Sequence, residues 1–241
     1  MHWKVRIRLP LSCLITLLLT PLCGQDDTGG LSLKPKLITP IQAIVPLALQ
    51  NKAIDKPQVV ARIQVSGAGT VEDLVVLEAS HVGLASRAES LIRKALFDPG
   101  DVSLKESVRF ELILPFRYPA ELGMQGISIS DDIESMIEAV KTEDKSLGFH
   151  PIKELDEPII VIDRGHVYRP EDEEGNVVNG EATVEVYVNH EGEVRLPRVV
   201  SSTHDEVALA AVATFSDMLF TKPLYKGRPA VTKVRLPFSA K

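Results

Sequence analysis

The chain has 241 residues, a formal net charge of −6 and two cysteines. This length is enough for one large domain or two small ones. The acidic balance argues against a nucleic-acid partner, because such a partner requires a basic surface. Both cysteines, Cys13 and Cys23, lie near the N-terminus. If that region is removed, the chain keeps no thiol for a disulfide, a cysteine metal site or a cysteine nucleophile.

Residues 1–24 have the layout of a secretory signal peptide. A basic start precedes an apolar run from Leu9 to Cys23, and a polar segment follows from Gln25. The run is shorter than the roughly 20 apolar residues that a spanning helix needs, and it contains prolines. We therefore expect cleavage, with export to the periplasm or cell envelope. Lipidation at Cys23 and an uncleaved anchor stay open as alternatives. Residues 25–39 are predicted to be a spacer, and residues 46–53 one or two helical turns.

The strongest signal in the sequence is an internal repeat, in which residues 60–116 match residues 183–238. At one constant offset, Val65, Gly69, Val71, His81, Ala85, Ala88, Leu96 and Phe97 fall on Val188, Gly192, Val194, His204, Ala208, Ala211, Leu219 and Phe220. After one deletion, Pro115 and Phe116 meet Pro237 and Phe238. A register that is kept through a hairpin and a helix and slips only in a connection is typical of a real repeat. The sequence thus predicts two units, at residues 40–116 and 156–241, joined by a connector at residues 117–155.

Each unit is predicted to contain a strand, a tight turn, a second strand, a helix and a third strand. In both second strands one apolar step spans three residues instead of two, as in Val71 to Leu74 and Val194 to Pro197. This spacing predicts a shared β-bulge, where a proline is tolerated. Ser80 is the predicted cap of the first helix. Thr203 forms a predicted capping box with Glu206 at the second.

The connector is predicted to hold one amphipathic helix, capped by Ser130. Its apolar stripe is formed by Ile133, Met136, Ile137 and Val140. The acidic run from Glu171 to Glu174 is expected to be solvated surface.

Motifs for catalysis are absent from the sequence. It contains no phosphate-binding glycine loop, no His-Glu-x-x-His run and no Gly-x-Ser-x-Gly turn. The best candidates for chemistry are His81 and His204, which we expect to be exposed at the two helix starts, but neither has further ligands spaced nearby. We predict no catalytic residue, no metal and no cofactor. A metal-dependent enzyme that uses His81 or His204 is kept as an alternative.

The second unit resembles the C-terminal domain of the TonB family of energy transducers. The resemblance is carried by Val184 to Val188, the turn from Asn189 to Gly192, Val199 to Ser202, Met218 to Phe220, Pro223, Gly227 to Ala230, Leu236 to Phe238 and the preceding Val167 to Pro170. It covers about a third of the chain well and the first unit more weakly.

The resemblance implies an α+β fold, with two tandem units that each have a three-stranded antiparallel sheet and helices on one face. It also implies a periplasmic role in protein contacts, in which an edge strand pairs with a short segment of an outer-membrane transporter. The chain departs from the family in its two units, its marginal anchor and its lack of a long proline-rich segment. We therefore predict an envelope protein-binding module. A membrane-anchored energy transducer is the alternative.

The predicted strand order in each unit is second, first, third, so that the third strand lies at an edge and can accept a partner strand. By alternation, the outward residues are Val231, Lys233 and Arg235 in the second unit and Arg109, Glu111 and Ile113 in the first. The two cations of the second unit suit a partner segment with acidic side chains. The two edges are expected to differ in preference.

Overall fold

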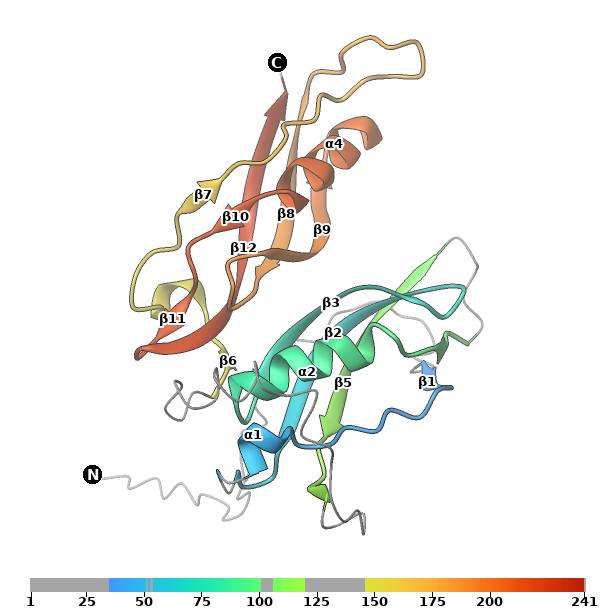
Figure 1. Ribbon diagram of the computed structural model, residues 1–241. Coiled ribbons are helices and arrows are strands. Elements are labelled where there is room, and N and C mark those ends of the chain that lie inside the picture. The colour runs from blue at the N-terminus through green and yellow to red at the C-terminus, as the bar shows by residue number, and fades with distance from the viewer. Residues whose placement is uncertain (1–34, 51, 53, 101–105, 120–145, 241) are drawn as a thin grey trace, which may run out of the picture. The chain divides into compact units, whose positions relative to one another are not determined.

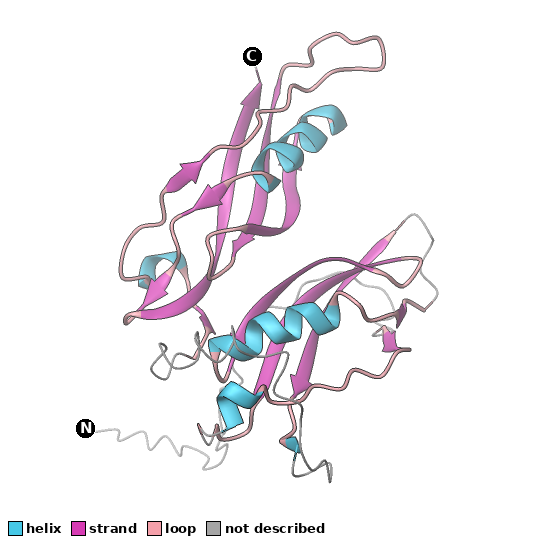
Figure 2. Ribbon diagram, in the orientation of Figure 1, coloured by secondary structure: helices cyan, strands magenta, loops and turns pink. Residues whose placement is uncertain are grey.

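The computed structural model describes residues 35–50, 52, 54–100, 106–119 and 146–240, which make a mixed α+β fold (Figures 1 and 2). These residues all belong to one compact unit of the chain, Leu33–Lys241. The predicted signal peptide and the predicted helix after Ser130 lie outside the described residues.

The first unit is built on a three-stranded antiparallel sheet in the order β3-β2-β5. Helix α2 packs against β3 and β2. The main elements are β2 (Gln58–Ser66), β3 (Val71–Ala79), α2 (Val82–Ile92) and β5 (Ser107–Pro115). The short elements are β1 (Lys36–Leu37), α1 (Leu47–Gln50) and β4 (Phe97–Asp98). The turn α1 agrees with the predicted helical turns after Pro46.

The second unit repeats this arrangement in the order β12-β8-β9, with α4 packed on the sheet. Its main elements are β8 (Gly180–Val188), β9 (Val194–Ser202), α4 (Asp205–Ser216) and β12 (Arg228–Ala240). The short elements are β6 (Gly148–Phe149), the 3-10 turn η3 (Ile152–Glu154), β7 (Val161–Asp163), β10 (Leu219–Phe220) and β11 (Leu224–Tyr225). Both sheets thus have the predicted strand order, with the first strand in the centre.

The third strands of the two units match each other in the structure with a register that differs from the register of the sequence repeat. In the first sheet Val65 pairs with Val108, whereas in the second the matching Val188 pairs with Thr232. The alignment had placed Val108 on Ala230, two residues earlier. A slip of one residue would exchange the two faces of a strand, but a slip of two preserves them. The predicted inward and outward sets are therefore unaffected.

The predicted bulges are present in both second strands. The register shifts between Gln64 and Val65 in the first sheet and between Glu185 and Tyr187 in the second. Each second strand also has another shift nearer its far end, which the sequence analysis did not predict. The central pairings with the third strands have no such shift. The two edges of each sheet are therefore different: one is irregular and the other is regular.

The hairpin turns require glycine for the same reason in both units. Gly69 and Gly192 have φ angles of 83° and 90°. A Cβ atom on Gly69 would lie 2.1 Å from the carbonyl oxygen of Phe97, and one on Gly192 would lie 2.0 Å from that of Phe220. Each phenylalanine N–H donates back to the glycine carbonyl, at 2.9 and 2.8 Å respectively. Each hairpin turn thereby packs closely against the segment that follows the helix of its unit, and a side chain at the glycine would prevent this contact.

Phe97 and Phe220, which match in the repeat, are both core residues. Phe97 is 1% exposed and Phe220 is 4% exposed. Phe97 belongs to an apolar cluster of the first unit that also includes Tyr187, Leu196 and Val231 of the second. Phe220, in β10, belongs to a second cluster whose other buried residues come from β8, β9, α4 and β12.

The helix caps differ from the prediction, because the N-cap residues are the two histidines. The Nδ1 atom of His81 accepts a hydrogen bond from the Gly83 N–H at 3.0 Å, while His204 makes no side-chain cap bond. The hydroxyl of Ser80 instead donates to backbone carbonyls near β2. The hydroxyl of Thr203 accepts from the Glu181 N–H. Both hydroxyls therefore hold the neighbouring strand and not the helix.

One predicted boundary also changes. Lys36 and Leu37, at the end of the predicted spacer, pair with Asp98 and Phe97. In the second unit, residues 170–175 form a turn closed by a bridge between Glu171 and Val177.

Candidate functional site

The outer edge of β12 is the predicted binding edge of the second unit, and the structure places its three predicted residues in different settings. Val231 is completely buried, with 0% of its surface exposed. The side chains of Lys233 and Arg235 are 37% and 67% exposed. The prediction that the Val231 side chain is exposed to a partner is thus wrong, because the rest of the chain already covers it.

The edge at Val231 is occupied by a strand of the same chain. Strand β6 pairs with β12 in parallel, with Gly148 beside Ala230 and Phe149 beside Val231. The His150 N–H donates to the Val231 carbonyl at 2.8 Å. A Val231→Pro substitution would therefore disturb this internal pairing and would not report on a partner.

Beyond Val231 the same edge is open within the described part of the chain. Backbone groups along a strand point alternately to its two sides, and the Val231 carbonyl points to β6, away from β8. Lys233, Arg235, Pro237 and Ser239 share that direction. Pro237 fits this assignment because a proline, which lacks the N–H, is tolerated where the N–H would face an open edge. The backbone groups from Arg235 to Ser239 are the ones that a partner strand can reach.

The cations on this edge already have an intramolecular partner. The Glu185 carboxylate lies 3.2 Å from Lys233 Nζ and 3.1 Å from Arg235 Nε. Burial raises the pKa of Glu185, but the hydrogen bonds and charges of Arg235 and Lys233 outweigh it, so that the pKa lies below its usual value. An acidic partner segment would therefore have to compete with Glu185 for these two cations.

The edge of β5 in the first unit is also regular, and β5 pairs only with β2 among the described residues. Ile113 is 62% exposed on it. Glu111 accepts a hydrogen bond from Arg62. Arg109 donates to Gln64 Oε1 at 2.7 Å and reaches over to the second unit. Of the predicted first-unit residues, Ile113 is the one whose side chain is free to meet a partner.

Arg109 and Asp73 bind the irregular edge of β9. The guanidinium of Arg109 donates to the carbonyls of Leu196 at 3.2 Å and Pro197 at 2.7 Å. The Asp73 carboxylate accepts from the Leu196 N–H at 2.6 Å. Leu196 has a φ angle of 50°, in the left-handed region, and lies in the bulge of β9. Side chains of the first unit thus satisfy the backbone groups that this bulge leaves unpaired.

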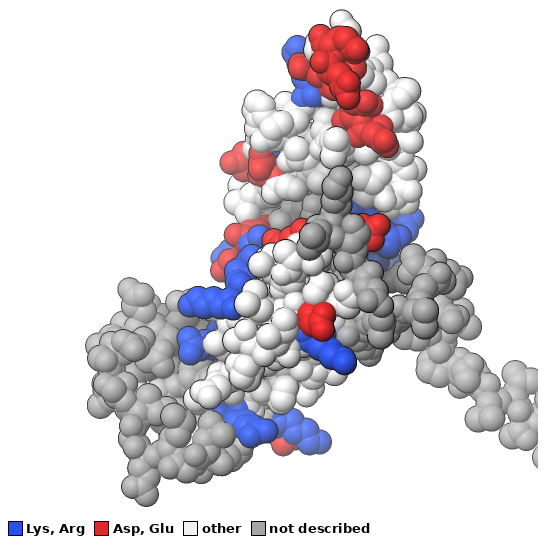
Figure 3. Space-filling view, turned by 90° about the vertical axis from the view of Figure 1, so that its right-hand side faces the viewer, with Lys and Arg blue, Asp and Glu red and all other residues white. Residues whose placement is uncertain are grey.

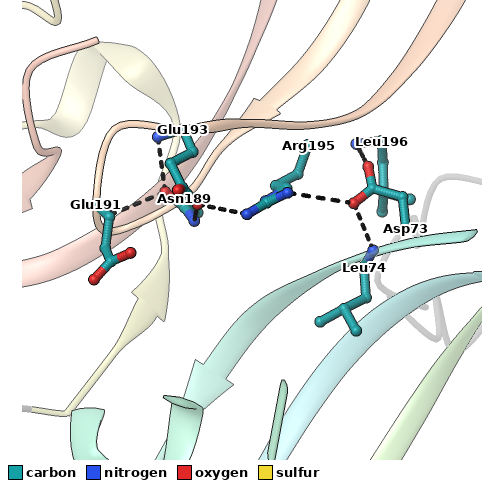
Figure 4. Close-up of polar contacts among 7 residues, drawn as sticks. All are labelled: Asp73, Leu74, Asn189, Glu191, Glu193, Arg195 and Leu196. Atoms are coloured by element: carbon teal, nitrogen blue, oxygen red, sulfur yellow. Dashed lines mark hydrogen bonds and ion pairs between the residues drawn. The ribbon is translucent and has the colours of Figure 1, made fainter. Parts of the chain in front are cut away.

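A chain of polar contacts extends from Asp73 to the hairpin of the second unit (Figure 4). Arg195 lies 3.9 Å from the Asp73 carboxylate and donates to Glu193 at 2.6 Å. Glu193 in turn accepts from the Asn189 side chain at 2.9 Å, and Asn189 Oδ1 accepts from the N–H groups of Glu191 and Glu193. The hairpin turn of the second unit is thereby linked to β3 of the first.

The electrostatics of this contact follow from its partial burial. Desolvation lowers the pKa of Arg109, although the Asp73 carboxylate acts in the opposite direction. For Glu193, burial raises the pKa, but the Asn189 hydrogen bond and the Arg195 charge lower it more. The lowered pKa keeps Glu193 ionised near neutral pH beside Arg195.

The histidines proposed for chemistry lie in unlike settings. His81 is 1% exposed, so the expectation of an exposed ring is wrong for it. His204 is exposed, as expected. Within the described residues, no group of three or more His, Cys, Asp or Glu side chains is placed to hold a metal ion. None of the described helices is both long enough and apolar enough to cross a membrane.

On the face shown in Figure 3, Lys and Arg side chains occur in separate groups and do not form one continuous basic surface. This distribution agrees with the net charge of −6. Sequence reasoning missed the contact of Asp73 and Arg109 with β9 and the pairing of β6. Neither has a sequence pattern that would reveal it, because both depend on contacts between residues that lie far apart in the chain. Searches of protein-family models, curated proteins and solved structures give no match to this chain.

Proposed function

We propose that the chain is a protein-binding module of the cell envelope that takes up extended segments of partner proteins by strand addition. The binding sites are the regular outer edges of β12, from Arg235 to Ser239, and of β5, around Ile113. The observation that carries this proposal is β6, because the chain itself adds an extended segment in parallel to the edge of β12. Backbone hydrogen bonds supply affinity in such pairing, and side-chain pockets supply specificity.

The remaining edges are less suited to a partner. Both β3 and β9 contain two register shifts, and the bulge of β9 is filled by Asp73 and Arg109. Bulges and charged side chains are the usual means by which an edge is protected from pairing. The regular edges of β12 and β5 carry no bulge, which favours them as binding sites.

The resemblance to the TonB C-terminal domain supports the same proposal. Each unit has three antiparallel main strands, the arrangement that this resemblance implies, and we propose that the units are tandem copies of such a domain. The partner would then be a segment of an envelope protein, such as an outer-membrane transporter. This proposal includes export through a cleaved signal at residues 1–24. The intact mass of the exported protein tests the export step, since retention of residues 1–24 would favour the anchored transducer and a lipid adduct on Cys23 a lipoprotein.

The edge proposal is tested with proline substitutions. A library of displayed peptides is selected on the purified protein, and the selected peptides are measured against Arg235→Pro and Ile113→Pro. Each proline removes one outward N–H and leaves the pairing to the central strand intact. The matched controls, Arg235→Ala and Ile113→Ala, remove only the side chain. We expect a peptide to lose binding to one proline variant and to keep it with the alanine control. Unchanged binding to both folded proline variants would exclude pairing through these N–H groups.

A further inference from the structure

The segment Leu147–His150 pairs with both units at once. Its first residue is bound to the edge of β3, since the Ala79 and Leu147 N–H groups each donate to the other's carbonyl at 3.0 Å. Its last residues are bound to the edge of β12 through β6 and the bond from His150 to Val231. Four consecutive residues thus connect two sheet edges.

The two ends of the segment are held unequally. Leu147 is 3% exposed and belongs to the apolar cluster of the first unit, whereas Phe149 is 38% exposed. The Phe149 ring lies 6.1 Å from that of Tyr187, and the His150 ring stacks on Tyr225 at 3.7 Å. On β12 the pairing covers only Ala230 and Val231. So short a pairing is easily replaced by a longer strand, which would gain more backbone bonds along the same edge.

We infer that Leu147–His150 is a displaceable internal strand that couples the edge of β12 to that of β3. This inference rests on the proposed function. A partner strand that pairs with β12 from Ala230 onward takes the place of Gly148–His150. Leu147 directly precedes Gly148, so displacement of Gly148–His150 also breaks the two hydrogen bonds between Leu147 and Ala79. The segment then leaves β3. Binding at the second unit is thereby transmitted to the edge of the first.

The coupling is tested by tethering the segment. Ala79 and Leu147 exchange two hydrogen bonds, and such antiparallel pairs have Cα atoms about 5.5 Å apart, within the range of about 4.4–6.8 Å for a disulfide. The test protein carries Ala79→Cys and Leu147→Cys, with Cys13→Ser and Cys23→Ser to leave no other thiol. The oxidised and reduced forms of one chain then serve as test and control, and a circular dichroism spectrum confirms that both are folded.

The probe is a peptide that copies residues 146–152, because this is a sequence that the structure places on the first part of β12. A cis segment competes with a free peptide at an effective concentration in the millimolar range. We expect the oxidised protein to bind the peptide at least about ten-fold more weakly than the reduced protein, measured by the Val231 amide shift in an NMR titration. In the reduced protein, peptide binding should also speed hydrogen exchange at the backbone amide of position 79.

Two results would overturn the inference. Equal binding to the oxidised and reduced forms would show that the segment need not leave. Binding to the reduced form without faster exchange at the amide of position 79 would show that β12 and β3 are not coupled. Both results are distinct from failure of the proposed function, which is measured by the selected peptides on Arg235→Pro and Ile113→Pro.

Discussion

The two units share their strand order, bulges and glycine turns, yet they carry opposite charges at the same cross-strand position. In the first sheet Arg62 pairs with Glu111, and in the second the matching pair is Glu185 with Arg235. Each pair is an ion pair between the central strand and the third strand. The shared backbone therefore accommodates an ion pair of either polarity at this position. What distinguishes the units is how much of each is covered by the other.

The difference in coverage is clearest in the second strands. Leu74, Val75, Val76 and Leu77 of β3 are all buried. In β9 the far half, from Arg198 to Ser202, is exposed. The apolar cluster of the first unit includes residues of the second, but the cluster of the second unit stands alone. The first unit is therefore the one whose core depends on the contact between them.

The largest expected effect tests what the units have in common. Phe97→Ala and Phe220→Ala should each lower the free energy of unfolding by about 3–5 kcal/mol, the range for truncating a buried aromatic side chain. Urea unfolding of both variants measures this. A much smaller loss for Phe220→Ala would mean that the second unit does not use its phenylalanine as a core anchor.

The next prediction tests the contact between the units. Asp73→Ala should cost about 1–3 kcal/mol, because it leaves the N–H of the buried Leu196 without its acceptor. Asp73→Asn keeps one side-chain oxygen and should cost less. The unfolding midpoints of the two variants give the comparison. If both match the wild type, the carboxylate does not stabilise the contact.

A smaller effect separates the two helix starts. His81→Ala removes the acceptor of the Gly83 N–H and should cost about 0.5–2 kcal/mol, the usual range for an N-cap. His204→Ala should cost under about 1 kcal/mol, because the ring is exposed and makes no cap bond. Thermal melts rank the two alanine variants by stability. His81→Asn, which restores a capping oxygen, should recover part of the stability lost in His81→Ala. A zinc-dependent rise in melting temperature that disappears in His204→Ala would instead support a metal site.

The smallest effect concerns the reversed ion pair. Glu185→Gln should cost about 0.2–1 kcal/mol at neutral pH, as for other ion pairs near a surface. Since the pKa of Glu185 is lowered on folding, its contribution is present above the pKa of the unfolded chain and is lost as the pH falls through the folded value. Unfolding measured from pH 7 to pH 3 should therefore show the variant and the wild type converging in acid. Parallel curves would contradict this assignment.

Local patterns in the sequence were enough to predict most of each unit. Apolar spacing located the strands, and the step from Val71 to Leu74 located a bulge, because both depend on alternation within one strand. The same alternation predicted the outward residues even though the third strands slip by two. The helix caps could not be predicted in this way. Ser80 and Thr203 have capping chemistry, but their hydroxyls bond to neighbouring strands that lie far away in sequence.

The contacts between the units could not be predicted from either unit alone. Val231 was expected to be exposed because it is outward on its own sheet, and only the other unit and β6 bury it. Arg109 was predicted to face a partner, and no sequence pattern marked Asp73. The role of both side chains depends on the bulge of β9. A contact between two units produces little periodicity in the sequence, because exposed polar residues of many kinds can form it.

Pro237 has a consequence for the behaviour of the protein at high concentration. A long regular edge invites copies of the same chain to stack on one another without limit, as in fibres. Because Pro237 faces the open side of β12 and has no N–H, a continuous ladder of backbone bonds along this edge is broken in the middle. Such an edge can hold a short segment on each side of the proline but cannot template a growing sheet. Resistance to fibre growth along this edge thus follows from the pyrrolidine ring of Pro237.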